Sequence, residues 1–281
     1  TGDITARGSG IHLQETTSQT INMAGNITAG GNGITLSFLN GANTTNLTGD
    51  ISAKQSGIYI DSDSQTINMT GDINSNGSAI RISSNSNYNT VTIEGNITEN
   101  TGYEAARGIL IDGNSDSNTV NVTGDITTTE APGIQISNSD SNTITLSGNV
   151  NSPGGHDFSL DGAILVNANS QDNTFNLNTG TTIIGGFDNA GTNTTINNQG
   201  TMDTLTNIGS VSSFNNSGTN TLLNNTGTMN SITNSGTINS ITNSGTMTTL
   251  NNENVIASLT NSGTVSSFNN SGTNTLLNNT G

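Results

Sequence analysis

The feature that most constrains the fold is a repeat in the first two thirds of the chain. A Gly-[Asp/Asn]-[Ile/Val] motif recurs at spacings of 22 to 29 residues, starting at Gly2, Gly25, Gly49, Gly71, Gly95, Gly124 and Gly148. Each unit carries three short segments, and the second and third alternate apolar and polar residues, as β-strands do. One unit has about five apolar residues, too few to bury alone, so the units must stack on one another.

The spacing of the segments predicts the kind of stack. The step from the third segment to the next unit is always six residues, whereas the step from the first to the second segment varies from 7 to 14. Three strands per turn of about 23 residues predict an all-β fold, a single-stranded right-handed parallel β-helix with three-sided rungs. We expect about 11 to 13 rungs, each about 4.8 Å from the next, with amides and hydroxyls coating the exterior. One predicted core column is Ile11, Ile34, Ile58, Ile80, Ile109, Ile134 and Ile164.

The C-terminal region changes to a nine-residue repeat. From Gly191 every ninth residue is glycine, except Asn254, which we interpret as replacing glycine in a left-handed turn. The segment Val211–Gly227 recurs identically 54 residues later, so that 18 or 27 residues per rung both fit. We therefore divide the chain into acidic rungs of 22–29 residues (1–177), a junction (178–190) and a continuous, nearly neutral nonapeptide solenoid (191–281).

Composition narrows the possible functions. The chain has a formal charge of −16, four basic residues, two histidines and no cysteine. It would repel phosphate backbones, so no nucleic acid is expected as a partner. The lack of cysteine excludes disulfides and thiolate metal sites. His12 lies in an outward slot of a predicted strand, which favours a solvated strand residue, and the His156-Asp157 pair specifies no reaction without a nucleophile in reach. We expect no enzyme activity and no cofactor.

The repeats resemble a known class of surface protein. Rungs such as Gly71-Asp72-Ile73-Asn74 and Gly57-Ile58-Tyr59-Ile60, and the run Asn234-Ser235-Gly236-Thr237-Ile238, are similar to passenger domains of bacterial autotransporters (type V secretion) and to filamentous-haemagglutinin-like adhesins. The resemblance is one of repeat style and covers nearly the whole chain. It implies a secreted, surface-displayed virulence-type adhesin that acts in cell–cell aggregation, biofilm formation or host adhesion. It also implies attachment to a C-terminal outer-membrane β-barrel outside this sequence, and we expect the chain to be an excerpt of a longer protein.

The third segment supplies the first candidate site. Its outward positions carry threonine in each of seven units and, two residues on, asparagine or threonine. The residues are Thr20, Asn22, Thr44, Asn46, Thr66, Asn68, Thr90, Thr92, Thr119, Asn121, Thr143, Thr145, Thr174 and Asn176. Three interpretations remain open for this flat, uncharged face: a ladder that only stabilises the fold, a face for homotypic self-association, and an ice-binding array.

A second candidate lies at the corner that accepts insertions. Inserts at 98–107 and 151–161 carry residue types that are rare in the repeats: Tyr103, Glu104, Arg107, His156, Asp157 and Phe158. Insertions in solenoids often build the binding surface. Two interpretations remain open for this corner: a neutral decoration of the fold, and a surface that binds a host glycan or surface protein. A polysaccharide-binding or polysaccharide-acting β-helix is the alternative function.

The acidic column after the repeat glycines could hold calcium. It reads Asp3, Asn26, Asp50, Asp72, Asn96, Asp125 and Asn149. Because asparagine and aspartate replace each other freely, we favour side chains that cap their own local turns, and we expect no metal site.

Overall fold

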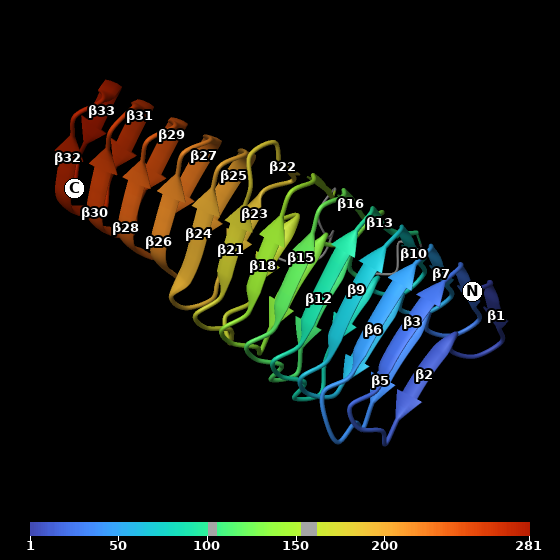
Figure 1. Ribbon diagram of the computed structural model, residues 1–281. Coiled ribbons are helices and arrows are strands. Elements are labelled where there is room, and N and C mark those ends of the chain that lie inside the picture. The colour runs from blue at the N-terminus through green and yellow to red at the C-terminus, as the bar shows by residue number, and fades with distance from the viewer. Residues whose placement is uncertain (101–105, 153–161) are drawn as a thin grey trace.

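The computed structural model describes residues 1–100, 106–152 and 162–281. Over these residues the fold is all-β, with 33 strands, no helix and parallel pairing between rungs. The chain winds as a right-handed parallel β-helix of about 12 turns, with the termini at opposite ends (Figure 1). The predicted fold class and number of rungs are confirmed. No helix among the described residues is long and apolar enough to cross a membrane.

Each N-terminal turn contributes one strand to each of three parallel ladders. The first-strand ladder contains β1 (Ile4–Ala6), β4 (Ile27–Ala29), β7 (Ile51–Ala53), β10 (Ile73–Ser75), β13 (Ile97–Glu99), β16 (Ile126–Thr127), β19 (Val150–Asn151) and β22 (Thr182–Ile184). The second-strand ladder contains β2 (Ile11–Gln14), β5 (Ile34–Ser37), β8 (Ile58–Asp61), β11 (Ile80–Ile82), β14 (Ile109–Asp112), β17 (Ile134–Ser137), β20 (Ile164–Val166) and β23 (Phe187–Asn189).

The third-strand sheet runs the whole length of the molecule. It contains β3 (Thr20–Ala24), β6 (Thr44–Thr48), β9 (Thr66–Thr70), β12 (Thr90–Glu94), β15 (Thr119–Val122), β18 (Thr143–Leu146), β21 (Thr174–Leu177), β24 (Thr194–Asn198), β26 (Ser210–Asn216), β28 (Thr228–Asn234), β30 (Thr246–Asn252) and β32 (Thr264–Asn270). The opposite wall of the C-terminal region contains β25 (Thr201–Asn207), β27 (Thr219–Asn225), β29 (Thr237–Asn243), β31 (Val255–Asn261) and β33 (Thr273–Asn279).

The first- and second-strand ladders merge at β25. Its first half pairs with β22 through Thr182 and Thr201, and its second half pairs with β23 through Phe187 and Leu205. A corner at Gly185-Gly186 separates β22 from β23, whereas β25 runs through both positions as one strand. Each later rung therefore has two strands, and paired residues such as Thr201 and Thr219 lie 18 positions apart. The nonapeptide region therefore has 18 residues per rung, and not 27.

Apolar side chains stack in register along the shaft. The predicted isoleucine column pairs rung by rung, beginning with Ile11 on Ile34 and ending with Ile134 on Ile164. Its members are buried, and they belong to one continuous apolar cluster that reaches Leu259. Full burial of each such side chain stabilises the fold by roughly 1.5–3 kcal/mol.

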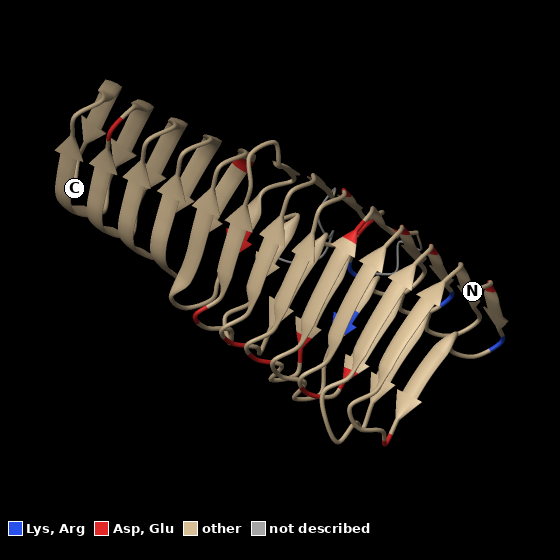
Figure 2. Cartoon of the chain, viewed as in Figure 1, with Lys and Arg blue, Asp and Glu red and all other residues tan. Residues whose placement is uncertain are grey.

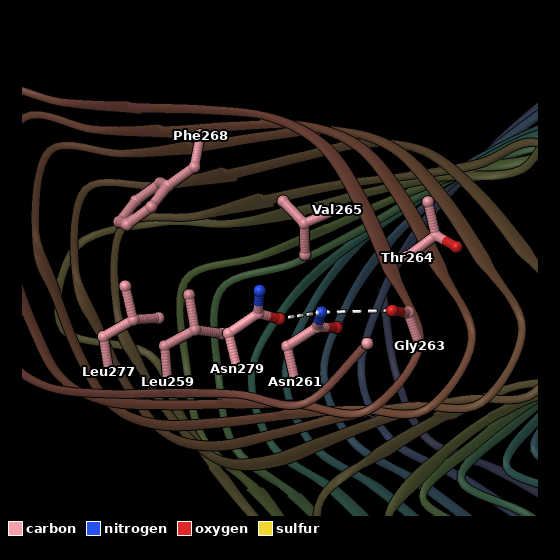
Figure 3. A pocket seen from close by; sticks show the side chains of 9 residues that line it. Leu259, Asn261, Gly263, Thr264, Val265, Phe268, Leu277 and Asn279 are labelled. Atoms are coloured by element: carbon pink, nitrogen blue, oxygen red, sulfur yellow. Dashed lines mark hydrogen bonds between the residues drawn. The ribbon is translucent and has the colours of Figure 1, made fainter.

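The expectation that amides coat only the exterior is wrong. In the nonapeptide rungs the last asparagine of each strand points into the shaft, where Asn207, Asn225 and Asn243 are 0–1% exposed. Each donates from Nδ2 to Oδ1 of the asparagine one rung on, at 2.6–2.7 Å. Figure 3 shows the last members, Asn261 and Asn279, facing the lumen beside Leu259 and Leu277. These amides are stable inside because the ladder satisfies them.

The interpretation of Asn254 is also wrong. Neither Asn254 nor the nonapeptide glycines from Gly200 onward have a positive φ. Glycine is favoured there because the rungs approach closely: a Cβ on Gly227 would lie 2.1 Å from the carbonyl oxygen of Gly209. The residue after Asn254 makes a longer backbone hydrogen bond to the neighbouring rung: Val255 N lies 3.2 Å from Gly236 O, whereas the equivalent distance from Thr246 N to Gly227 O is 2.9 Å. A small backbone shift therefore makes room for the side chain.

Candidate functional site

The predicted threonine and asparagine residues form one face of the third-strand sheet. Thr44 pairs with Thr66, and Asn46 with Asn68, and the same register continues through all seven predicted rungs. The side chains are half-buried or exposed, whereas intervening residues such as Ile67 are buried. The structure therefore brings all fourteen predicted residues together on one outward surface.

This surface continues over five further rungs that the sequence analysis did not include. One column continues with Thr195, Ser213, Ser231, Thr249 and Ser267, and the other with Asn197, Asn215, Thr233, Asn251 and Asn269. Successive nonapeptides belong to opposite walls of the solenoid, so only every second one contributes here. The 18-residue offset was the signal that could have revealed them. We call the complete set of two columns over twelve strands the Thr/Asn face.

Hydrogen bonds link neighbouring amides along the second column. Asn46 Nδ2 donates to Asn22 Oδ1 at 2.7 Å, and Asn68 Nδ2 donates to Asn46 Oδ1 at 2.9 Å. Asn215 and Asn197 repeat the arrangement at 2.8 Å in the C-terminal region. A primary amide has two N–H donors and two acceptor lone pairs. The ladder uses one of each, so the amides are oriented and still keep bonding capacity for a partner.

The Thr/Asn face is almost free of charge. Its twelve strands contain one charged residue, Glu94, whose Oε2 accepts a hydrogen bond from Thr70 Oγ1 at 3.2 Å. Most acidic residues lie instead at the corners of the rungs, as Figure 2 shows. Two such faces could therefore meet without bringing like charges together, although the whole chain carries −16.

The acidic column serves the backbone of neighbouring rungs. Asp50 Oδ1 accepts a hydrogen bond from the backbone N–H of Asp72 at 2.9 Å, and Asp72 Oδ1 accepts one from Asn96 at 2.6 Å. The same bond joins every rung from Asp3 to Thr182. Aspartate and asparagine are interchangeable, as expected, but each caps the next rung and not its own turn. Within the described ranges no group of three or more histidine, aspartate or glutamate side chains is placed to hold a metal ion.

The insert corner is described only in part. Tyr103, Glu104, His156, Asp157 and Phe158 lie outside the described residues. Arg107 is described and is 7% exposed, with its Nε donating to Gln135 Oε1 at 2.6 Å. Burial lowers the pKa of the Arg107 guanidinium, and the charge of Glu99 acts in the opposite direction. The predicted surface cation is thus a largely buried group that braces the wall behind the corner.

His12 is an exposed strand residue, as predicted, with its Nε2 3.1 Å from Ser37 Oγ.

Comparison with known proteins gives no match to a family model, a curated protein or a solved structure.

Proposed function

We propose that this chain is a surface-displayed, non-enzymatic adhesin whose Thr/Asn face docks on the same face of a second copy. Cell–cell aggregation or biofilm growth would follow from that contact. The observation that carries the proposal is the face itself: two columns of hydroxyl and amide side chains in register over twelve rungs, on strands that hold a single charged residue, Glu94. The resemblance of the repeats to autotransporter passenger domains supports display of the chain at the cell surface.

The physical basis is the addition of many weak contacts. A single hydrogen bond between such side chains contributes about 0.5–1.5 kcal/mol net. Rungs about 4.8 Å apart give both copies the same spacing, so the contacts repeat along the rod and act as a multivalent set. Little apolar area needs to be buried, because the exposed positions of the face are polar.

The test places charges on the face. Asn121→Asp, Thr143→Asp and Asn197→Asp together would bring like charges into a face-to-face contact. We expect the triple variant to lose self-association, measured by sedimentation of the purified chain and by settling of cells that display it. The matched control is Thr28→Asp, Ser52→Asp and Asn74→Asp, three exposed outward positions of the first-strand ladder.

Charge reversal makes the test specific for a homotypic contact. Lysine at the same three positions should also abolish self-association, and mixing the aspartate and lysine variants should restore it. Unchanged association of the aspartate variant, or equal loss in the control, contradicts the proposal. Each chain carries a formal charge of −16, so two copies repel each other. Association should therefore weaken when the ionic strength falls to about 0.01 M, because the Debye length is then about 30 Å and salt no longer screens this repulsion at contact.

A further inference from the structure

A shallow groove crosses the second-strand ladder at β11, β14 and β17, away from the Thr/Asn face. Its volume is about 510 Å³, and its lining includes Arg81, Arg107, Leu110, Asp112, Gln135 and Ser137. Arg81 also lines an adjoining hollow of about 240 Å³ that contains Lys54. Three of the four basic residues of the chain therefore gather at one place on an acidic molecule.

Arg81, Leu110 and Gln135 in this groove belong to a longer column on the second-strand ladder that does not repeat. Side by side in register lie His12, Thr35, Tyr59, Arg81, Leu110, Gln135 and Leu165. Stacking between rungs favours like residues, as the unbroken hydroxyl column of the Thr/Asn face shows. A column whose chemistry changes at nearly every rung is not explained by stacking, and such variety is typical of a surface that contacts something else.

An incompletely satisfied ion pair stands in the groove. Arg81 Nη2 lies 3.1 Å from Asp112 Oδ2, and the Arg81 side chain is 43% exposed. Arg81 Nε and Asp112 Oδ1 are buried and have no hydrogen-bond partner. One pair of residues thus leaves both a donor and an acceptor unused, which is costly for a folded protein unless a ligand or a side-chain rotation satisfies them.

The wall beside this pair is fixed in place. Gln135 accepts from Arg107 Nε through Oε1 and donates through Nε2 to Asn167 Oδ1 at 3.4 Å. Asn167 Nδ2 in turn donates to Ser137 Oγ at 3.1 Å. Leu110 lies between Arg81 and Gln135, and its side chain, which is 9% exposed, lines the groove. The groove therefore combines fixed amides and hydroxyls with a small apolar floor.

We propose that this groove binds a saccharide. A sugar hydroxyl is the group that can accept from Arg81 Nε and donate to Asp112 Oδ1 at once, because it carries one donor and two lone pairs. A small movement of the half-exposed Arg81 side chain opens both atoms to it. Leu110 contacts the apolar face of the sugar ring, while Ser137 and Gln135 bond further hydroxyls. The site is independent of self-association because it lies on a different wall of the solenoid.

The test measures binding of defined probes to the full chain. Neutral hexose tetrasaccharides and hexuronic-acid tetrasaccharides are titrated by calorimetry and by NMR of the side-chain amides of Gln135 and of Asn138, which also lines the groove. Arg81→Ala and the isosteric Asp112→Asn should each weaken binding at least about tenfold, since Arg81→Ala removes the donor to the bridging hydroxyl and Asp112→Asn removes the charge and one of the two acceptor oxygens. The control is His12→Ala, the same outward slot three rungs away. Thermal unfolding is measured for every variant, so that loss of binding is separated from loss of fold.

The outcomes decide the proposal in either direction. Binding of either probe series that is lost in both groove variants and kept in His12→Ala supports it, and the preferred series identifies the sugar class. Failure of every saccharide to bind overturns it, as does binding that both groove variants leave unchanged. Self-association measured on the same variants should stay at the wild-type level, so a failure here does not bear on the Thr/Asn face.

Discussion

Asn225 donates from Nδ2 to Oδ1 of Asn243 at 2.7 Å, inside the shaft of the solenoid. The two residues are 18 positions apart, one full rung, and both are 0–1% exposed. The same Nδ2 lies 3.1 Å from the carbonyl oxygen of Thr246, so one amide joins side-chain and backbone partners. Rungs with few apolar residues can therefore stack because buried amides replace part of an apolar core.

Removing one member of this ladder should destabilise the protein. Asn225→Ala removes the side-chain acceptor of Asn207 Nδ2 and leaves Asn243 Oδ1 without its donor, and an unsatisfied buried polar group costs about 1–3 kcal/mol. We expect a lower midpoint in chemical unfolding. Asn224→Ala, one residue away on the outer side, is the control and should change the free energy of unfolding by less than about 0.5 kcal/mol.

Substitution of Asn220 should have the opposite effect and stabilise the protein. Asn220 is fully buried in a column between Met202 and Ile238, and its Oδ1 has no hydrogen-bond partner. Asn220→Met should stabilise the protein by about 1–2 kcal/mol, because it removes an unsatisfied acceptor and restores the apolar column. The melting temperature measures the change. A lower melting temperature would show that the amide is satisfied in solution.

Close approach of the rungs makes particular glycines irreplaceable. Gly71 has φ of 145°, and a Cβ there would lie 2.3 Å from the carbonyl oxygen of Gly49. Gly71→Ala should therefore cost about 2–4 kcal/mol through a steric clash and an unfavourable backbone conformation. Gly8 has nothing within 4 Å of its Cβ position, so Gly8→Ala should leave thermal stability unchanged.

An aromatic pair fills the shaft near the place where the ladders merge. The rings of Phe175 and Phe187 meet edge to face, with centroids 4.8 Å apart, and both residues are fully buried. Phe175→Ala leaves a cavity and should cost about 3–5 kcal/mol. Phe38, which is 66% exposed, provides the comparison, since Phe38→Ala should be nearly neutral. Equal effects of the two substitutions in urea unfolding would contradict this account of the core.

Asp61 should give stability a measurable dependence on pH. Burial raises the pKa of its carboxyl in the folded protein. The folded state therefore binds the proton more readily than the unfolded chain, and the stability gained by protonation is present at low pH and lost as pH rises through the raised pKa. Asp61→Asn should be slightly more stable than the wild type at pH 7. That advantage should disappear below the pKa of an unfolded aspartate, about 3.9.

The repeat in the sequence was sufficient to predict the fold of the N-terminal rungs. Apolar columns such as Ile11 on Ile34 could be predicted because strands alternate sides with a period of two, and one register alone buries every isoleucine. The same alternation predicted that Thr66 and Asn68 point outward. Nothing in the sequence identified the groove at Arg81 and Asp112, since residues 31 positions apart meet there only after the rungs stack.

In the nonapeptide region the sequence determined the repeat, and the tertiary structure decided how it is used. Alternation breaks inside β27, where Thr221 and Leu222 both lie toward the outside between buried Asn220 and Leu223. From such a pattern, periodicity cannot tell which of Asn224 and Asn225 faces inward, nor whether two or three strands close a rung. Stacking decides both, because the two-strand rung aligns Asn207, Asn225 and Asn243 and thereby satisfies their buried amides.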